Sequence, residues 1–131
     1  ISIELNVDTT LLGLQVYIDK RAMIRAINNL IANASRYASS KISISFYQDE
    51  LGYSISVEDD GCGIPSNEWE KVFTPFAQIG NGQRGGNSGH GLGLAIVKQI
   101  MQWHNGEVNL SESSLGGAKF ILSWPLSQKR K

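Results

Sequence analysis

The sequence predicts an α/β (α+β) two-layer sandwich in which about three helices cover one face of a mixed, largely antiparallel sheet. Three observations indicate this fold class: short apolar–polar alternations typical of strands, two longer amphipathic stretches typical of helices, and strands that mostly follow one another across short turns. The chain has 131 residues, of which 41% are hydrophobic and 18% charged, as expected for one globular domain.

The first half of the chain contains an amphipathic helix and two pairs of strands. Residues 2–7 and 14–18 alternate as strands, and Asp19 is the predicted N-cap of a helix that runs to about residue 37 or 38. Residues 41–47 and 53–58 follow as antiparallel strands, joined by a hairpin turn at 49–52. The apolar residues of the helix recur at about 100° per residue: Met23, Ile27, Leu30, Ile31 and Ala34.

The second half contains two helices and a final strand pair. Ser66 is the predicted cap of a short helix over residues 67–71. A longer helix is predicted over residues 95–103, with its end at about residue 104. Gly106 is predicted to take the C′ position of this helix. The last strands, 108–110 and 118–124, are expected to pair across a turn at 116–117.

Composition excludes several classes of function. The formal net charge is zero and the basic residues are scattered, so the basic patch of a nucleic-acid-binding protein is missing. Cys62 is the only cysteine, which excludes an internal disulfide and favours a reducing compartment. Cys62, His90 and His104 lack the spacing of a metal site. The chain starts at Ile1, and we expect a piece of a longer protein: a folded domain over 1–126 and a solvated basic tail over 127–131.

A glycine-rich loop comes directly before the longer second helix. Seven of the chain's 14 glycines lie in residues 80–94, and the loop tightens to Gly-His-Gly-Leu-Gly where the helix begins. Unpaired backbone N–H groups and the positive end of a helix dipole attract phosphate, so the loop predicts a phosphate site. The alternative is a disordered linker that leads into an ordinary helix.

Two further patterns carry polar chemistry. Asn29 and Asn33 lie one helical turn apart, on an arc shared with Arg36 and Tyr37, and amide oxygens can complete the ligand shell of a magnesium ion that a nucleotide also binds. The alternative is a pair of solvated helix residues.

Asp59 ends a strand and is followed by Gly61 and Gly63. A buried carboxylate there can accept a hydrogen bond from an exocyclic amine, and the glycines let a flat base approach the backbone. The alternative is an ordinary Asp-Gly turn. The Rossmann fingerprint and the P-loop pattern are both incomplete in this sequence.

Together these patterns resemble the ATP-binding catalytic domain of bacterial sensor histidine kinases, within the superfamily shared with gyrase, Hsp90 and the mismatch-repair ATPases. The N box resembles NLIANASRY at 29–37, the G1 box DDGCGIP at 59–65, the F box VFTPF at 72–76 and the G2 box GHGLGLAIV at 89–97. The GGAKF at 116–120 fits as well, and the end of the last strand is similar to the RstB branch of these kinases.

The resemblance implies the Bergerat ATP-binding fold, with ATP and Mg²⁺ as cofactors and with roles for particular residues. Asn29 and Asn33 would be catalytic, with Asn33 as the magnesium ligand. Asp59 would bind the adenine amine, Arg36 and Arg84 would face phosphates, and Phe73 and Phe76 would anchor the lid. The implied ATP-binding set also includes Tyr37, Gly61, Gly63, Ile64, Gly89, His90, Gly91, Leu92, Gly93 and Leu94.

One position separates the kinases from the ATPases of this superfamily. The ATPases carry a glutamate four residues before the magnesium asparagine, where this chain has Asn29, and an amide is unable to act as a general base. The residue between the G1 glycines also departs from the family pattern, because Cys62 replaces the usual proline and brings a thiol near the base pocket.

The implied function is the Mg-ATP-binding catalytic domain of a two-component sensor histidine kinase. It would donate the γ-phosphoryl group to a histidine on a separate dimerisation domain, which is absent from this sequence. A response regulator receiver domain would then accept the phosphoryl group from that histidine. We therefore expect no autophosphorylation by this chain, since neither His90 nor His104 is a suitable acceptor. The expected parent is a membrane-bound bacterial homodimer, with this domain in the cytoplasm. The alternatives are a nucleotide-binding module without turnover and a gyrase-type ATPase.

Overall fold

The computed structural model describes residues 2–7, 19–50, 52–74 and 93–125, so the strand expected over 14–18 lies outside the described residues. The described elements run in this order: β1 (Ser2–Val7), α1 (Lys20–Tyr37), β2 (Lys41–Gln48), β3 (Gly52–Asp59), η2 (Ser66–Glu68), η3 (Lys71–Phe73), α2 (Gly93–Trp103), β4 (Glu107–Glu112) and β5 (Ala118–Pro125). The labels η2 and η3 denote short 3₁₀ helices.

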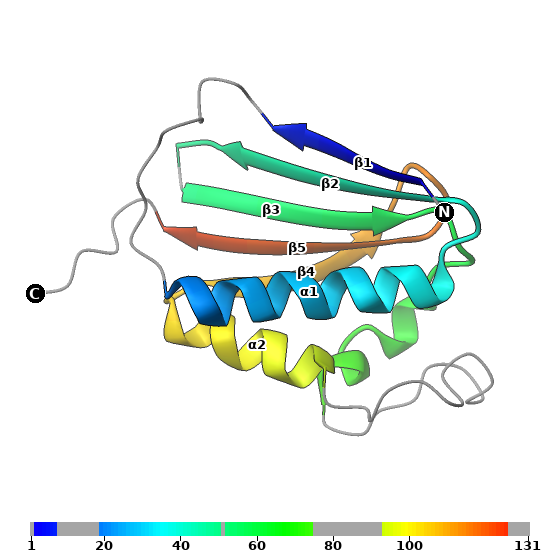
Figure 1. Ribbon diagram of the computed structural model, residues 1–131. Coiled ribbons are helices and arrows are strands. Elements are labelled where there is room, and N and C mark those ends of the chain that lie inside the picture. Colours follow the sequence, from blue (N-terminus) through cyan, green and yellow to red (C-terminus); the bar gives the residue numbers. More distant parts are fainter. Residues whose placement is uncertain (1, 8–18, 51, 75–92, 126–131) are drawn as a thin grey trace, which may run out of the picture.

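The five strands form one sheet in the order β1-β2-β3-β5-β4 (Figure 1). β1 runs parallel to β2, and every other neighbouring pair is antiparallel. The central strand β3 pairs with β2 on one side and β5 on the other, with Val57 opposite both Ile44 and Phe120. The mixed, largely antiparallel sheet predicted from the sequence is confirmed.

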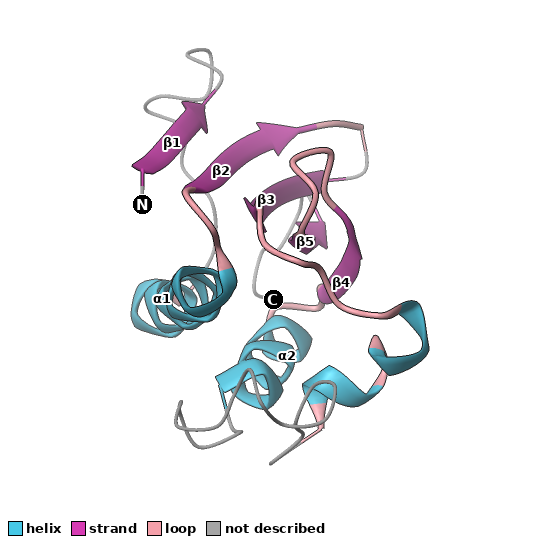
Figure 2. Ribbon diagram, turned by 90° about the vertical axis from the view of Figure 1, so that its right-hand side faces the viewer, coloured by secondary structure: helices cyan, strands magenta, loops and turns pink. Residues whose placement is uncertain are grey.

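The helices lie on one face of this sheet, which makes two layers (Figure 2). Alternate residues of β3 point toward the helices, and Val57 in the middle of the strand is 1% exposed. The core lies between the layers because α1, α2 and the inner face of the sheet each bury apolar side chains there. Its fully buried members include Ala26, Leu30, Ile42, Val57, Val97, Met101, Phe120 and Leu122.

The first helix begins as its sequence predicts. Asp19 is the N-cap, and its Oδ1 accepts a hydrogen bond from the backbone N–H of Ala22 at 3.2 Å. The helix buries Met23, Ala26 and Leu30, while its charged residues remain on the outside. The 18-residue α1 therefore presents one apolar stripe to the core, as its periodicity indicates.

Two predictions about helix ends are wrong. Ser66 does not cap a helix over 67–71: it is the first residue of η2, it follows Pro65, and no side-chain hydrogen bond caps that turn. A second 3₁₀ helix, η3, follows at Lys71–Phe73 instead of a continuous α-helix. The segment buries Val72 alone among the residues of η2 and η3, too little apolar contact to hold several α-helical turns.

At the end of α2 the residue with left-handed backbone is Asn105 (φ 58°), so Gly106 occupies C″ and not the predicted C′. The N–H of Gly106 bonds to the carbonyl of Met101 at 2.8 Å and the N–H of Asn105 to that of Gln102 at 3.1 Å, the hydrogen-bond pattern of a Schellman motif. Gly106 is required for another reason. A Cβ there would lie 2.1 Å from the carbonyl oxygen of Ser123.

Candidate nucleotide-binding site

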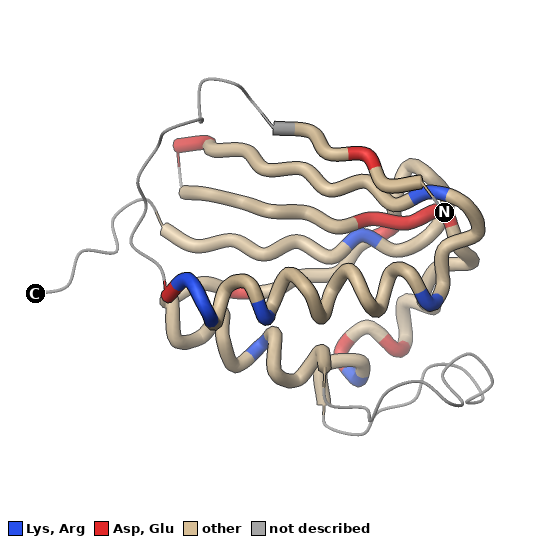
Figure 3. Tube along the Cα trace, in the orientation of Figure 1, with Lys and Arg blue, Asp and Glu red and all other residues tan. Residues whose placement is uncertain are grey.

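Three segments with predicted site residues converge at one end of the sandwich: the second half of α1, the end of β3 with the following turn, and the start of α2. A Cβ added to Gly61 would lie 2.2 Å from the carbonyl oxygen of Tyr37, which shows how closely the turn approaches α1. Asn29 and Gly93 join α1 to α2 by a hydrogen bond. Lys and Arg residues are distributed along several of the described elements, as the blue positions on the Cα trace in Figure 3 show.

Asp59 is the most buried acidic residue of this region, with 2% of its surface exposed. Its Oδ1 accepts the backbone N–H of Gly61 at 2.8 Å, and its carbonyl oxygen accepts the N–H of Gly117 at 3.1 Å. A Cβ at Gly117 would lie 2.1 Å from Oδ1, so only glycine fits beside the carboxylate. The sequence indicated Gly117 only as part of a turn, because its contact with β3 depends on strand pairing.

The turn after β3 is fixed by its own contacts. Gly63 has a left-handed backbone (φ 79°), which glycine adopts without strain. Ile64 is 8% exposed, and its carbonyl oxygen accepts the indole N–H of Trp69 at 2.8 Å. The apolar side chain proposed to line the base pocket is therefore held on the core by the η2 region.

Asp60 holds the loop between α1 and β2 in place. Its carboxylate accepts hydrogen bonds from the backbone N–H groups of Ser39, Ser40 and Lys41 and from the Ser40 hydroxyl, at 2.7–3.1 Å for the shortest contact of each donor. These bonds, led by the backbone N–H of Ser40, hold the pKa of Asp60 well below its usual range. The sequence did not indicate this role, because the three backbone donors come from a different segment.

The two asparagines of α1 differ in their contacts. The Asn29 Nδ2 donates to the carbonyl oxygen of Gly93 at 3.2 Å. Asn33 is only 7% exposed, yet its side chain makes no hydrogen bond to any residue in the described part of the chain. Among the described residues, the fully buried side-chain atom without a partner is Trp124 Nε1, so the Asn33 amide keeps contact with solvent and can offer its oxygen to a hydrated cation.

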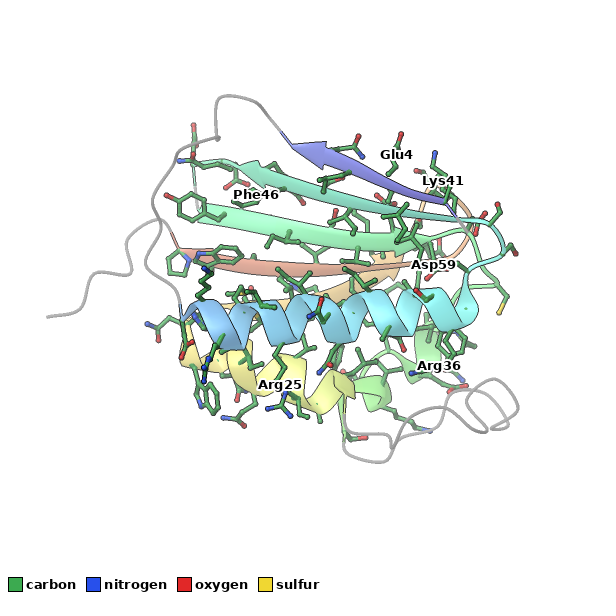
Figure 4. The ribbon with its side chains drawn as sticks, viewed as in Figure 1. Glu4, Arg25, Arg36, Lys41, Phe46 and Asp59 are labelled. Atoms are coloured by element: carbon green, nitrogen blue, oxygen red, sulfur yellow. The ribbon has the colours of Figure 1, made fainter. Side chains whose placement is uncertain are left out.

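Arg36 lies near the end of α1, on its exposed side (Figure 4). Its guanidinium carbon lies 5.8 Å from the centre of the Tyr37 ring, within the range of a cation–π contact. No carboxylate pairs with Arg36 among the described residues. An ion pair elsewhere in the described residues joins Glu4 of β1 to Lys41 of β2 at 3.4 Å (Figure 4). The positive charge of Arg36 is therefore available to an anion.

The remaining predicted site residues divide between placed and undescribed positions. Leu94 is half-buried at the start of α2, and the Phe73 ring stands edge-on to Phe120 with 6.0 Å between the ring centres. The contact with Phe120 fixes Phe73 to the core. Six predicted residues lie outside the described residues: Phe76, Arg84, Gly89, His90, Gly91 and Leu92.

Cys62 and His104, two further residues with reactive side chains, differ in their exposure to solvent. Cys62 is exposed. His104 is 6% exposed, with its Nδ1 2.9 Å from the Ile100 carbonyl and its Nε2 accepting the Asp19 N–H at 2.9 Å. Both ring nitrogens of His104 are therefore occupied, which supports the expectation that it does not accept a phosphoryl group.

The described residues contain no metal cluster, and a surface cavity that they line lies away from this site. In residues 2–7, 19–50, 52–74 and 93–125, no group of three or more His, Cys, Asp or Glu side chains is arranged to hold a metal. A surface cavity of about 460 Å³ lies at the opposite end of β3, lined by residues that include Asp49, Tyr53, Glu107 and Trp124. It contains none of the residues predicted for the site.

Comparison with known proteins was consistent with this geometry. Residues 18–128 match the family of histidine kinase-, DNA gyrase B- and HSP90-like ATPases, HATPase_c. The chain belongs to this family. The match covers the described N-box helix, the G1 turn and both pairs of antiparallel strands, so the family resemblance and the Bergerat fold predicted from the sequence are confirmed.

Relatives of this HATPase_c domain are sensor kinases. The chain is 36% identical over 114 residues to the sensor histidine kinase CpxA of Escherichia coli, covering 87% of the chain and 25% of that protein. It is 39% identical over 120 residues to the sensor protein RstB of the same organism, covering 92% of the chain and 28% of that protein. The chain thus spans about a quarter of the length of these relatives.

Solved structures agree with the sequence relatives. The catalytic domain of the histidine kinase ThkA superposes with a TM-score of 0.80 at 27% identity, covering 96% of this chain and 80% of that one. The histidine kinase domain of the E. coli osmosensor EnvZ gives a TM-score of 0.69 at 34% identity, covering 98% and 78%. The chain is an ATP-binding catalytic domain of the histidine kinase type. No helix within the described ranges is long and apolar enough to span a membrane.

Proposed function

We propose that this domain binds Mg-ATP between α1 and the turn after β3 and donates the γ-phosphoryl group to a histidine on a separate dimerisation domain. The phosphoryl group would leave ADP as a histidine ring nitrogen attacks the γ-phosphorus, and would then pass to an aspartate of a response regulator receiver domain. The domain contributes position and charge, since phosphoryl transfer needs little other covalent chemistry from the protein.

The buried Asp59 carboxylate is the single observation that carries this proposal. Its Oδ1 is oriented by the Gly61 N–H, and the backbone at Gly61 and Gly117 packs so closely that no side chain fits between it and the carboxylate. A buried carboxylate selects a hydrogen-bond donor, and the exocyclic amine of adenine is such a donor. Tyr37, Gly63 and Ile64 would complete the base pocket.

The phosphate end of the site would use both helices. Asn33, of which 7% is exposed, would supply an oxygen to Mg²⁺. The ion would neutralise charge on the phosphates as the γ-phosphoryl group departs. Arg36 and Arg84 would face the phosphates. The backbone N–H groups of the glycine run would approach the same phosphate oxygens; this run comprises Gly89, His90, Gly91, Leu92, Gly93 and Leu94. Phe76 would anchor the loop.

Asn29 favours transfer over hydrolysis. A water molecule attacking ATP needs a base to accept its proton, and the Asn29 amide is unable to accept one. Its Nδ2 already donates to the Gly93 carbonyl. We therefore infer a kinase domain with little ATPase activity. The domain would extend over residues 1–126 and would be followed by a basic tail at 127–131. The parent would be a membrane-bound homodimeric sensor with this domain on the cytoplasmic side.

The first experiment is a calorimetric titration of the domain with ATP or a non-hydrolysable analogue, with and without magnesium. We expect binding that strengthens in the presence of magnesium. The domain with bound ATP is then mixed with a dimerisation domain of the CpxA or RstB type that carries the acceptor histidine, and labelled histidine is measured.

The outcomes separate three functions. Labelled histidine is the expected result. Magnesium-dependent binding without any labelled histidine would indicate a binding module, and steady release of phosphate by the isolated domain would indicate a gyrase-type ATPase. Absence of binding at millimolar nucleotide would contradict the proposal altogether.

A further inference from the structure

Asn29 and Asn33 lie one turn apart on α1, yet only Asn29 has a hydrogen-bond partner among the described residues. Its Nδ2 donates to the carbonyl oxygen of Gly93, a residue 64 positions away in the sequence. Asn33 has no such partner. Two residues that look equivalent in sequence therefore occupy different chemical environments.

The partner of Asn29 lies in the first described turn of α2. Gly93 is the last glycine of the Gly-His-Gly-Leu-Gly run, so its position sets where α2 starts relative to α1. A Cβ added at Gly93 would lie 3.9 Å from the Asn29 Cγ, an ordinary van der Waals distance. The two helices are thus already in contact at this point, and the amide adds a directed bond to that contact.

The same pair of helices is joined by a second hydrogen bond at its other end. The backbone N–H of Asp19, at the start of α1, donates to the Nε2 of His104, just after α2, at 2.9 Å. Between the two bonds the helices bury Ala26, Leu30, Val97 and Met101 in the common core. The apolar contacts are non-directional, whereas a hydrogen bond at each end joins one specific pair of atoms.

We propose that Asn29 is a positioning residue whose N–H group holds the first turn of α2 against α1. Its contribution to nucleotide binding is then through Gly93 and the backbone that follows it, while Asn33 serves the metal. This inference rests on the proposed function for its consequence, whereas the contact itself is a hydrogen bond within the chain.

The test uses substitutions that separate the two atoms of the amide. Asn29→Asp keeps an oxygen able to bind magnesium but loses the donor to Gly93, and Asn29→Ala loses both atoms without adding charge. Asn33→Ala is the matched control one turn away. Hydrogen exchange of the Val97 and Lys98 amides, in the protein without nucleotide, reports the opening of the first part of α2.

We expect Asn29→Asp and Asn29→Ala to speed exchange of these amides about 2- to 13-fold, the change that corresponds to the net contribution of one hydrogen bond. Asn33→Ala should leave their exchange unchanged. Unchanged exchange in both Asn29 variants would overturn the proposal, whether or not the domain binds ATP, so this result is independent of the proposed function.

Nucleotide binding provides the second readout. If Asn29 positions α2, each Asn29 variant lowers the affinity for ATP, and for each variant the factor is the same with magnesium as without it. Asn33→Ala should weaken ATP mainly when magnesium is present. If Asn29→Asp instead retains Mg-ATP affinity while Asn29→Ala loses it, then the oxygen of Asn29 is a metal ligand and the positioning role is refuted.

Discussion

Two neighbouring carboxylates, Asp59 and Asp60, follow different physical rules. Asp59 is buried, and Gly61 and Gly117 pack against it. Asp60 accepts hydrogen bonds from the loop that joins α1 to β2. One side chain is presented to a candidate ligand and the other holds the chain around it. Their effects on binding and on stability should therefore separate.

Asp59→Asn tests the binding role. The amide keeps the size of the carboxylate and an oxygen for the Gly61 N–H, so the fold should persist with a melting temperature close to that of the unmodified domain. It loses the charge that strengthens a hydrogen bond to the adenine amine, so ATP affinity should fall by about 10- to 100-fold. Calorimetry measures the affinity, and thermal unfolding provides the control. Unchanged affinity would remove Asp59 from the base pocket.

Asp60→Asn tests the stabilising role through pH. Hydrogen bonds to the carboxylate, first that of the Ser40 N–H, hold the Asp60 pKa below the value of about 4 typical of an unfolded chain. The folded state therefore binds a proton less readily than the unfolded state. The stabilisation is fully present above about pH 4 and is lost as the pH falls toward the folded-state pKa.

The measurement is urea unfolding of the domain and of Asp60→Asn between about pH 7 and pH 3, a range that includes the unfolded-state pKa. We expect the variant to be less stable at pH 7, with the difference in unfolding free energy shrinking as the pH is lowered. Glu50→Gln, at an exposed position on the β2–β3 turn, is a control for the loss of one surface charge. A constant difference between Asp60→Asn and the unmodified protein would show that the Asp60 carboxylate is not the linked group.

At the scale of the element, two adjacent residues at the end of α2 each meet a different structural requirement. Asn105 supplies the left-handed backbone of the Schellman motif, and Gly106 supplies the space that β5 needs. Asparagine is among the residues that adopt this backbone at modest cost. The left-handed backbone and the tight packing are therefore on consecutive residues, whereas the sequence pattern predicted the left-handed position at the glycine.

A matched pair of variants separates these requirements. Asn105→Gly should change the unfolding free energy by less than about 1 kcal/mol, because glycine also adopts the left-handed backbone. Gly106→Ala should destabilise by about 1–3 kcal/mol, because its Cβ would lie 2.1 Å from the Ser123 carbonyl and the backbone would have to move. Denaturant unfolding compares the two. Equal effects would contradict the packing role of Gly106.

Elements and their order followed from local patterns, because hydrophobic period and caps act within a few residues. The periodicity of α1 and the Asp19 cap were sufficient to place that helix, and alternation placed β2, β3 and β5. Ser66 was misjudged because a serine before polar residues predicts a cap whether or not an apolar face exists to support the helix.

The candidate site divides in the same way. Asp59, Asn29 and Asn33 are predicted site residues because each lies in a recognisable local motif of the sequence. The roles of Gly117, Asp60 and the Gly93 carbonyl were not predicted, since each depends on a partner brought close by strand pairing or helix packing. No periodicity encodes contacts between segments so far apart.

At the scale of the whole molecule, the sandwich connects the site to global stability. The sheet and both helices share one core, and the predicted nucleotide contacts come from α1, β3 and α2 together. A ligand that binds this arrangement and not the unfolded chain must stabilise the whole domain. Thermal unfolding with nucleotide therefore tests the site without assuming which residue makes which contact.

Mg-ATP should raise the melting temperature, and Mg-GTP should not. At a ligand concentration of 100 times Kd the stabilisation is about 2.7 kcal/mol, which corresponds to roughly 8–13 °C for a domain of this size. Guanine presents a carbonyl where adenine presents its amine, so the buried Asp59 carboxylate would face a second acceptor in place of a donor. In Asp59→Asn the difference between the two nucleotides should shrink, because an amide can turn its N–H toward a carbonyl. Equal melting shifts with ATP and GTP in the unmodified domain would mean that the phosphates alone are bound, and that the Asp59 carboxylate does not read the base.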